Sequence, residues 1–159
     1  MSAKYEHKTD ALLSDHKRLV QWYKKNRRSL PWRENKDPYR IWLSEVMLQQ
    51  TTVVAVIPYF EKFIKSFPTV QDLAAAPEAD VLEAWAGLGY YSRARNLHKA
   101  AKALAVQGFP KTAAELLELP GFGPYTSRAV SSIAFGEKVG VLDGNVIRVL
   151  SRKYGLKLE

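Results

Sequence analysis

Apolar residues recur along most of the chain at steps of three and four positions, the spacing of one face of an α-helix. The clearest stripe joins Val53, Ile57, Phe60, Ile64 and Phe67. Similar stripes run through residues 12–23 and 90–104. Alternating apolar and polar runs between hairpin turns, the pattern of β-strands, are missing. The sequence therefore predicts an all-α fold.

Short segments containing glycine or proline separate these stripes, as expected for tight connections in a helical domain. They include Asp37-Pro38, Phe67-Pro68-Thr69, Gly87-Leu88-Gly89 and the run from Pro120 to Pro124. Helices are predicted over residues 38–50, 113–119, 125–135 and 145–154, among about eight to ten in all. The last of these is followed at once by Gly155 and the chain end, which suggests that a longer protein has been shortened.

Charge gives the first indication of function. The 159 residues carry 24 lysines and arginines against 16 acidic residues, a net charge of +8. Such a surplus on one domain favours a polyanionic partner, most simply nucleic acid, although a basic surface that only aids solubility would have the same composition. The N-terminus has no signal peptide and no apolar run could span a membrane, so we expect a cytoplasmic, nucleoid-associated protein.

The chain has no cysteine. This excludes a disulfide framework, a cysteine nucleophile and any thiolate-held metal or iron–sulfur cluster within these residues. The three histidines show no metal-ligand spacing, and no nucleotide-binding loop is present. We therefore expect no metal site and no cofactor in this chain.

The segment Leu119-Pro120-Gly121-Phe122-Gly123-Pro124-Tyr125-Thr126 joins two predicted helices. Gly121 and Gly123 permit positive φ angles and a close approach of bare backbone to a partner, and Pro124 suits the first turn of a helix. Amides at that helix start can hold a phosphate without reading base sequence. The alternative is a plain connection between two helices.

This hairpin and four further segments resemble, in the same order, MutY-type adenine DNA glycosylases of the helix-hairpin-helix superfamily. The other segments are Leu30-Pro31-Trp32-Arg33, residues 42–51, residues 87–98 and Leu142-Asp143-Gly144-Asn145-Val146, so the resemblance covers about residues 30–154. It implies a monomeric enzyme that removes adenine mispaired with 8-oxoguanine or guanine from duplex DNA. It also implies one helical catalytic domain, with a core of roughly six helices at residues 28–136 and the hairpin at 119–126. Residues 1–27 and 137–159 would belong to a second, incomplete lobe.

Glu45 has Ile41 one turn before it and Leu48 one turn after it, so its carboxyl group lies among apolar side chains. Desolvation there raises a carboxyl pKa, which suits a proton donor, whereas an exposed helix glutamate is the alternative. The resemblance makes Glu45 the acid that protonates adenine at N7. It makes Asp143 the anion that stabilises the sugar cation, although Asp143 also fits a helix N-cap.

Two further catalytic assignments rest on the same resemblance. Asn145 would hold the Asp143 carboxylate, unless it is a first-turn helix residue without a partner. Tyr125 stands where strand-nicking relatives such as endonuclease III have a lysine. Because a phenol cannot form an imine, we expect base release without strand cleavage. A role as a plain hairpin core aromatic is the alternative for Tyr125.

The resemblance also assigns residues that contact DNA. Gln50 and Thr51 match the wedge that fills the gap left by a flipped nucleotide, and Tyr90 matches an intercalating aromatic residue, with Leu88 beside it. The remaining candidates are Arg33 near the substrate pocket, and Gly121, Gly123 and Thr126 in the hairpin. For Tyr90, a place in the helical core is the alternative.

Relatives of this type hold a 4Fe-4S cluster with four cysteines and continue into a domain that senses 8-oxoguanine. We expect neither in this cysteine-free chain, and a cluster would belong only to a longer form. Two other functions stay open: a non-catalytic helix-hairpin-helix fragment that binds DNA, and a thymine-mismatch glycosylase of the same superfamily.

Overall fold

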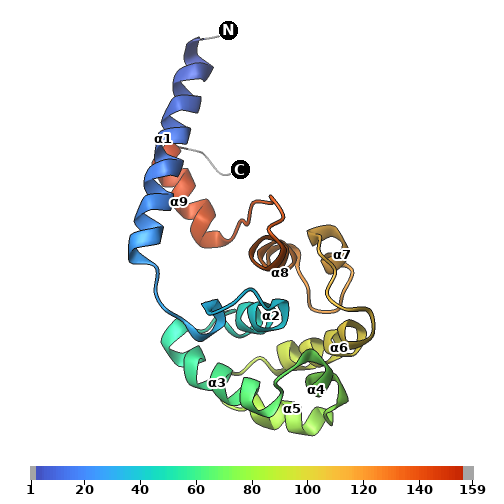
Figure 1. Ribbon diagram of the computed structural model, residues 1–159. Coiled ribbons are helices and arrows are strands. Elements are labelled where there is room, and N and C mark those ends of the chain that lie inside the picture. The colour runs from blue at the N-terminus through green and yellow to red at the C-terminus, as the bar shows by residue number, and fades with distance from the viewer. Residues whose placement is uncertain (1–2, 156–159) are drawn as a thin grey trace. The chain divides into compact units, whose positions relative to one another are not determined.

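The computed structural model describes residues 3–155, with side chains from residue 14 onward, and all of its regular structure is helical (Figure 1). The α-helices are α1 (Ala3–Asn26), α2 (Pro38–Met47), α3 (Val53–Ser66), α4 (Val70–Ala75), α5 (Glu78–Ala84), α6 (Tyr91–Gln107), α7 (Ala113–Leu117), α8 (Pro124–Val130) and α9 (Gly144–Tyr154). A 3₁₀ turn, η1 (Pro31–Arg33), precedes α2, and a π-helical turn, η2 (Ser131–Phe135), continues α8. The predicted all-α class is confirmed.

Side-chain caps fix where several helices begin. Asp37 accepts a hydrogen bond from the amide of Tyr39 at 2.9 Å, directly before Pro38 opens α2. Thr69 and Thr112 start α4 and α7 with reciprocal capping boxes. Each cap satisfies amides that have no acceptor inside the helix, and a cap of this kind is worth about 1 kcal/mol.

The chain divides into two compact units with the boundary between Leu30 and Pro31. The first contains α1, and the second contains all the other helices. In the second unit, α2 packs against α3 and α6 on one side and against α8 on the other (Figure 1). Its side chains Trp42, Leu43 and Met47 are almost completely buried, so α2 forms the centre of the core. The predicted assignment of the chain ends to one incomplete lobe stays a prediction.

The structure departs from the predicted helix boundaries at two places that concern the site. The helix expected over residues 38–50 ends at Met47, with Leu48 as its C-cap. The helix expected over 125–135 changes to π geometry after Val130. Within the described residues, no helix is long and apolar enough to cross a membrane.

Candidate active site

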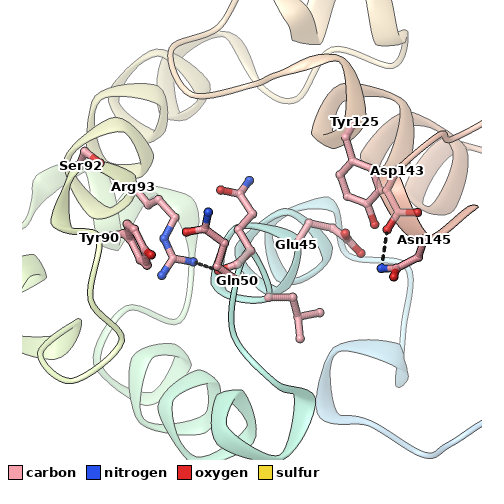
Figure 2. Close-up of a pocket in the computed structure, with 10 residues that line it drawn as sticks. Glu45, Gln50, Tyr90, Ser92, Arg93, Tyr125, Asp143 and Asn145 are labelled. Atoms are coloured by element: carbon pink, nitrogen blue, oxygen red, sulfur yellow. Dashed lines mark hydrogen bonds between the residues drawn. The ribbon is translucent and has the colours of Figure 1, made fainter. Parts of the chain in front are cut away.

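A cleft of about 530 Å³ opens in the second unit where α2, α6, α8 and α9 approach one another. It is lined by Glu45, Leu48, Gln49, Gln50, Tyr90, Ser92, Arg93, Tyr125, Asp143 and Asn145. Figure 2 shows two groups with Gln50 between them: Glu45, Tyr125, Asp143 and Asn145 on one side, and Tyr90, Ser92 and Arg93 on the other. Residues nearly one hundred positions apart in sequence therefore share one cavity, as the resemblance implied for Glu45 and Asp143.

Glu45 lies in the last turns of α2, half-buried, next to the fully buried Ser44, Val46 and Met47. Burial raises the pKa of its carboxyl group above the ordinary 4.5, and a hydrogen bond with Tyr125 and the charge of Arg33 offset only part of that rise. The carboxyl group thus keeps its proton to higher pH than an exposed glutamate does. This excludes the alternative of an exposed helix glutamate.

Tyr125, the second residue of α8, is 38% exposed and points its phenol toward Glu45 and Asp143 (Figure 2). Burial, the charge of Glu45, the hydrogen bond to Glu45 and the charge of Asp143 together raise the pKa of Tyr125 to about 12. The phenol is therefore neutral at physiological pH and donates a hydrogen bond to the Glu45 carboxyl group. Tyr125 is not a hairpin core aromatic.

Asp143 is the N-cap of α9, as the sequence predicted, and accepts a 2.7 Å hydrogen bond from the amide of Val146. Asn145 donates to its other carboxylate oxygen at 3.2 Å and itself accepts from Arg148 at 2.8 Å. The bond from the Val146 amide is the main reason that the pKa of Asp143 lies below the ordinary 3.8, and Asn145 adds to it. Asn145 thus has the partner that the sequence analysis proposed for it.

The two carboxyl groups of the cleft therefore have opposite tendencies. Burial favours the neutral acid at Glu45, and hydrogen-bond donors favour the anion at Asp143. Opposite shifts of two carboxyl pKa values are the arrangement in which one group can donate a proton while the other remains an anion. Glycoside hydrolysis uses this pair to protonate a leaving group and to stabilise the sugar cation that remains.

The other end of the cleft carries two strained residues. Gln50 and Tyr90 have φ angles of 58° and 48°, and they are the non-glycine residues with positive φ in the described chain. Left-handed backbone is costly for residues with a Cβ, and it persists where the surroundings enforce it, often at functional sites. Tyr90 is 62% exposed and precedes α6, so it does not belong to the helical core.

Several predicted contact residues lie outside the cleft lining. Leu88 is buried, with 7% of its surface exposed, so its side chain is not available to DNA in this conformation. Thr126 is also buried and is paired with Gln49 at 3.4 Å, which leaves only its backbone for an outside contact. Contact of Leu88 and Thr126 with DNA stays a prediction, and both side chains are buried in this conformation. Arg33 and Thr51 border the site without lining it, and Arg33 is near enough to affect Glu45.

The hairpin between α7 and α8 exposes Gly121, whereas Phe122 is buried and stacks on Trp42 at 5.3 Å between ring centroids. Gly121 has a φ of +76°, and Gly123 forms the N-cap of α8 with extended backbone. The buried Phe122 therefore anchors the hairpin to α2, and the glycines on either side of it stay close to the surface.

Comparison with known families agrees with this geometry. Residues 43–159, which include every member of the cleft, match the HhH-GPD superfamily base excision DNA repair protein. The chain belongs to the HhH-GPD superfamily. The helix-hairpin-helix glycosylase fold predicted from the sequence is confirmed.

Curated relatives share much of the sequence. An "Adenine DNA glycosylase" of Buchnera aphidicola subsp. Baizongia pistaciae is 46% identical over 145 residues, which cover 89% of this chain and 41% of that protein. The human "Adenine DNA glycosylase" is 47% identical over 146 residues, covering 84% of this chain and 27% of that protein. The chain thus spans about two fifths or less of the length of these relatives.

Solved HhH-GPD structures superpose well on this chain. A thermostable thymine-DNA glycosylase has a TM-score of 0.76 and 31% identity, with 83% of this chain and 63% of that chain covered. A non-covalent endonuclease III–DNA complex has a TM-score of 0.75 and 25% identity, with 91% of this chain and 70% of that chain covered. The arrangement of helices around the cleft is therefore shared with proteins of this superfamily that act on DNA.

The iron–sulfur cluster implied by the resemblance does not fit the residues of this chain. Four thiolates hold such a cluster, and the sequence contains no cysteine. The part of the chain that the structure describes also contains no group of three or more His, Asp or Glu side chains arranged to hold a metal ion.

Sequence reasoning missed four residues of the lining: Leu48, Gln49, Ser92 and Arg93. Gln49 and Leu48 fall inside a matched segment, and their place directly before Gln50 was the available signal. Ser92 and Arg93 fall inside the matched segment of residues 87–98, and Arg93 lines the cleft and contacts Tyr90. Arg93 follows Gly89 by four residues, one helical turn, and reaches back to the carbonyls of Leu88 and Gly89.

Proposed function

We propose that this chain is a monofunctional adenine DNA glycosylase, which removes adenine mispaired with 8-oxoguanine or guanine in duplex DNA. The observation that carries the proposal is the pair of carboxyl groups in one cleft, with the pKa of Glu45 raised and the pKa of Asp143 lowered. A module that only binds DNA does not need one carboxyl group with a raised pKa and a second with a lowered pKa in the same cleft. This pair therefore favours catalysis over simple binding.

In the proposed reaction, a flipped adenine enters the cleft and Glu45 donates a proton to N7 of the base. The glycosidic bond then breaks, and the electron pair leaves with the protonated base. Asp143, an anion held by the Val146 amide and Asn145, stabilises the positive charge that forms on the sugar. Addition of water at C1′ leaves an abasic site, and the water's proton passes to solvent or to a carboxylate of the pair.

Absence of an amine in the cleft supports base release without strand cleavage. None of the ten lining residues is a lysine, and Tyr125 occupies the hairpin position next to the carboxyl pair. A lysine amine would attack C1′ and form a Schiff base that leads to strand scission, whereas a phenol forms none. The abasic strand should therefore stay intact until alkali or another enzyme cleaves it.

Adenine as the target base rests on the relatives rather than on the cleft alone. The curated relatives named adenine DNA glycosylase are 46–47% identical to this chain, and the thymine-DNA glycosylase structure is 31% identical. The segment from Ser44 to Thr51, which contains the acid and the wedge, is also part of the resemblance to adenine enzymes. Both observations favour adenine over thymine.

A single-turnover assay on labelled duplexes tests the proposal, with alkali added to open abasic sites. We expect adenine release opposite 8-oxoguanine and guanine, and no release of thymine opposite guanine. Glu45→Gln keeps the shape of the side chain and removes the proton, so the rate should fall about 10²–10⁴-fold while duplex binding survives. Glu61→Gln, an exposed position on α3, makes the same chemical change away from the cleft and should leave the rate unchanged.

Each other outcome has a definite meaning. Thymine release from T:G duplexes, with adenine untouched, would replace the proposal with a thymine-mismatch enzyme. Duplex binding without any base release would identify a binding module. A Glu45→Gln protein as active as Glu61→Gln would remove Glu45 from the reaction.

A further inference from the structure

Arg93 makes an unusual set of contacts at the wedge end of the cleft. Its Nη1 donates to the backbone carbonyls of Val46 and Gln49 at 2.8 and 2.7 Å, and to that of Met47 at 3.3 Å. Its Nη2 donates to the carbonyls of Leu88 and Gly89 at 3.1 and 3.4 Å. One planar guanidinium thus joins the end of α2 to the turn before α6, two segments more than 40 residues apart in sequence.

The carbonyls that Arg93 binds lie directly before the two strained residues. Gln49 precedes Gln50, and Gly89 precedes Tyr90, the left-handed non-glycine residues of the described chain. The last carbonyls of α2 lack partners inside the helix, and a cation at a helix C-terminus is favourable there. Arg93 therefore supplies hydrogen-bond donors to the last carbonyls of α2, where the backbone leaves the helix and continues to Gln50.

The guanidinium of Arg93 lies over two aromatic rings. Its carbon lies 5.5 Å from the ring centroids of both Trp85 and Tyr90. The Trp85 indole also donates to the Gly89 carbonyl at 3.1 Å, and the Trp85 ring is fully buried. The turn is thereby fixed to the core on one side and to Arg93 on the other, as Figure 2 shows for Arg93 between Tyr90 and Gln50.

We propose that Arg93 is a positioning residue that sets the distance and direction between Gln50 and Tyr90, and so determines how the enzyme distinguishes the base opposite the target adenine. This inference rests on the proposed function, because it assumes that Gln50 and Tyr90 enter the duplex. Arg93 itself touches neither the adenine nor the sugar in this proposal. Its effect is transmitted through the backbone that it binds.

The prediction concerns selectivity more than overall rate. A duplex with 8-oxoguanine opposite adenine uses the wedge contacts, and a duplex with an abasic analogue opposite adenine does not. Loss of the Arg93 hydrogen bonds should therefore lower the rate on the 8-oxoguanine duplex by about 10²-fold, an effect that a misplacement of about 1 Å can have. It should change the rate on the abasic-analogue duplex far less. A merely structural role would lower both rates together and leave their ratio constant.

Three variants separate geometry from charge. Arg93→Met removes the donors and keeps the length of the chain, and Arg93→Lys keeps the charge without the planar fork. Arg95→Met is the matched control, since Arg95 lies on the same helix and is half exposed, with an ion pair to Glu78 at 3.5 Å. Arg95→Met removes one positive charge, as Arg93→Met does, but removes no hydrogen bond to the backbone next to Gln50 and Tyr90.

We expect the rate ratio of the 8-oxoguanine duplex to the abasic-analogue duplex to fall about tenfold or more in both Arg93→Met and Arg93→Lys, and to stay at the wild-type value in Arg95→Met. Far-UV circular dichroism confirms that each variant is folded. A second readout, fluorescence of 2-aminopurine at the target position, reports flipping without chemistry and should drop in the Arg93 variants.

The outcomes distinguish this inference from the proposed function. If the wild-type chain releases no adenine from either duplex, the proposed function fails. If the wild type is active and Arg93→Met keeps its ratio and its 2-aminopurine signal, Arg93 has no positioning role. A wild-type rate ratio in Arg93→Lys alone would show that the positive charge suffices. That result would also overturn the proposal that the planar guanidinium positions Gln50 and Tyr90.

Discussion

Gly121 offers a sharp test of how the hairpin is held against α6. Its φ of +76° lies in the left-handed region, and a Cβ built on it would meet the Cβ of Asn96 at 2.8 Å. A Cβ is fixed to its backbone, so neither atom can rotate out of the way. Replacement by alanine must therefore move the hairpin or α6.

Two costs of Gly121→Ala can be worked out from this geometry. Left-handed backbone costs alanine about 1–2 kcal/mol, and the overlap with Asn96 adds about 1–2 kcal/mol as an overpacked contact. The free energy of unfolding should thus fall by about 2–4 kcal/mol. For a chain of this size each kcal/mol corresponds to about 2–4 °C, so Tm should fall by roughly 5–15 °C.

Gly123→Ala is the matched control in the same hairpin. Gly123 has a φ of −90°, and nothing lies within 4 Å of its built Cβ. An alanine there restricts the unfolded chain and should leave Tm unchanged or raise it slightly. Thermal unfolding followed by circular dichroism compares the two variants under one set of conditions.

A double-mutant cycle isolates the contact with Asn96. Asn96→Gly removes the opposing Cβ at a helix-propensity cost of about 0.3–0.5 kcal/mol, and the double variant should recover about 1–2 kcal/mol relative to the sum of the single changes. Equal Tm values for Gly121→Ala and Gly123→Ala would refute the whole argument. A zero coupling energy would refute the overlap and leave only the backbone strain.

Three further expectations concern the carboxyl pair. Tyr125→Phe removes the hydrogen bond that lowers the pKa of Glu45, so the alkaline limb of the pH–rate profile should move to higher pH, and an unmoved limb would contradict that role. Because the folded-state pKa of Glu45 is raised, ionisation of its carboxyl group costs stability as pH rises through that value. Glu45→Gln should therefore have a higher Tm than the wild type at pH 7. The difference in Tm should disappear below pH 4.5 in a pH series of melting curves. Borohydride should trap no protein–DNA adduct with the wild type and should trap one with Tyr125→Lys; strong trapping by the wild type would identify another lysine as nucleophile.

Local patterns in the sequence sufficed for much of the fold and for the acid end of the cleft. Periodicity of apolar residues predicted α3 and α6 within about three residues of their observed ends. Ile41 and Leu48, one turn either side of Glu45, predicted the burial that raises its pKa. Asp143 before a helical run predicted the observed N-cap. Each of these features depends on neighbours within a few positions along the chain.

The wedge end depends on contacts that no local pattern contains. Apolar and polar residues after Met47 suit a helix as far as Gln50, yet α2 ends at Met47 because the following backbone turns to meet Arg93. Leu88 between two glycines is typical of an exposed turn residue, yet it is buried beside the core. In both cases a partner distant in sequence accompanies the conformation, so local patterns in the sequence did not predict the geometry of these residues, and their role as a wedge stays a prediction.

The energetics of Arg93 explain how strain can be kept at the site without weakening the core. Each left-handed residue costs about 1–3 kcal/mol, and each hydrogen bond from a charged donor contributes about 1.5–3 kcal/mol. The short bonds to Val46 and Gln49 and the bond to Leu88 are therefore of the same order as the strain at Gln50 and Tyr90. Because the bonds reach only backbone at the ends of α2 and the turn, their loss should release the wedge and leave the packing of Trp42, Phe60 and Leu97 intact. The proposal for Arg93 therefore predicts that selectivity for the opposite base and stability of the domain can be changed separately, and a ratio of rates is the measurement that tests it.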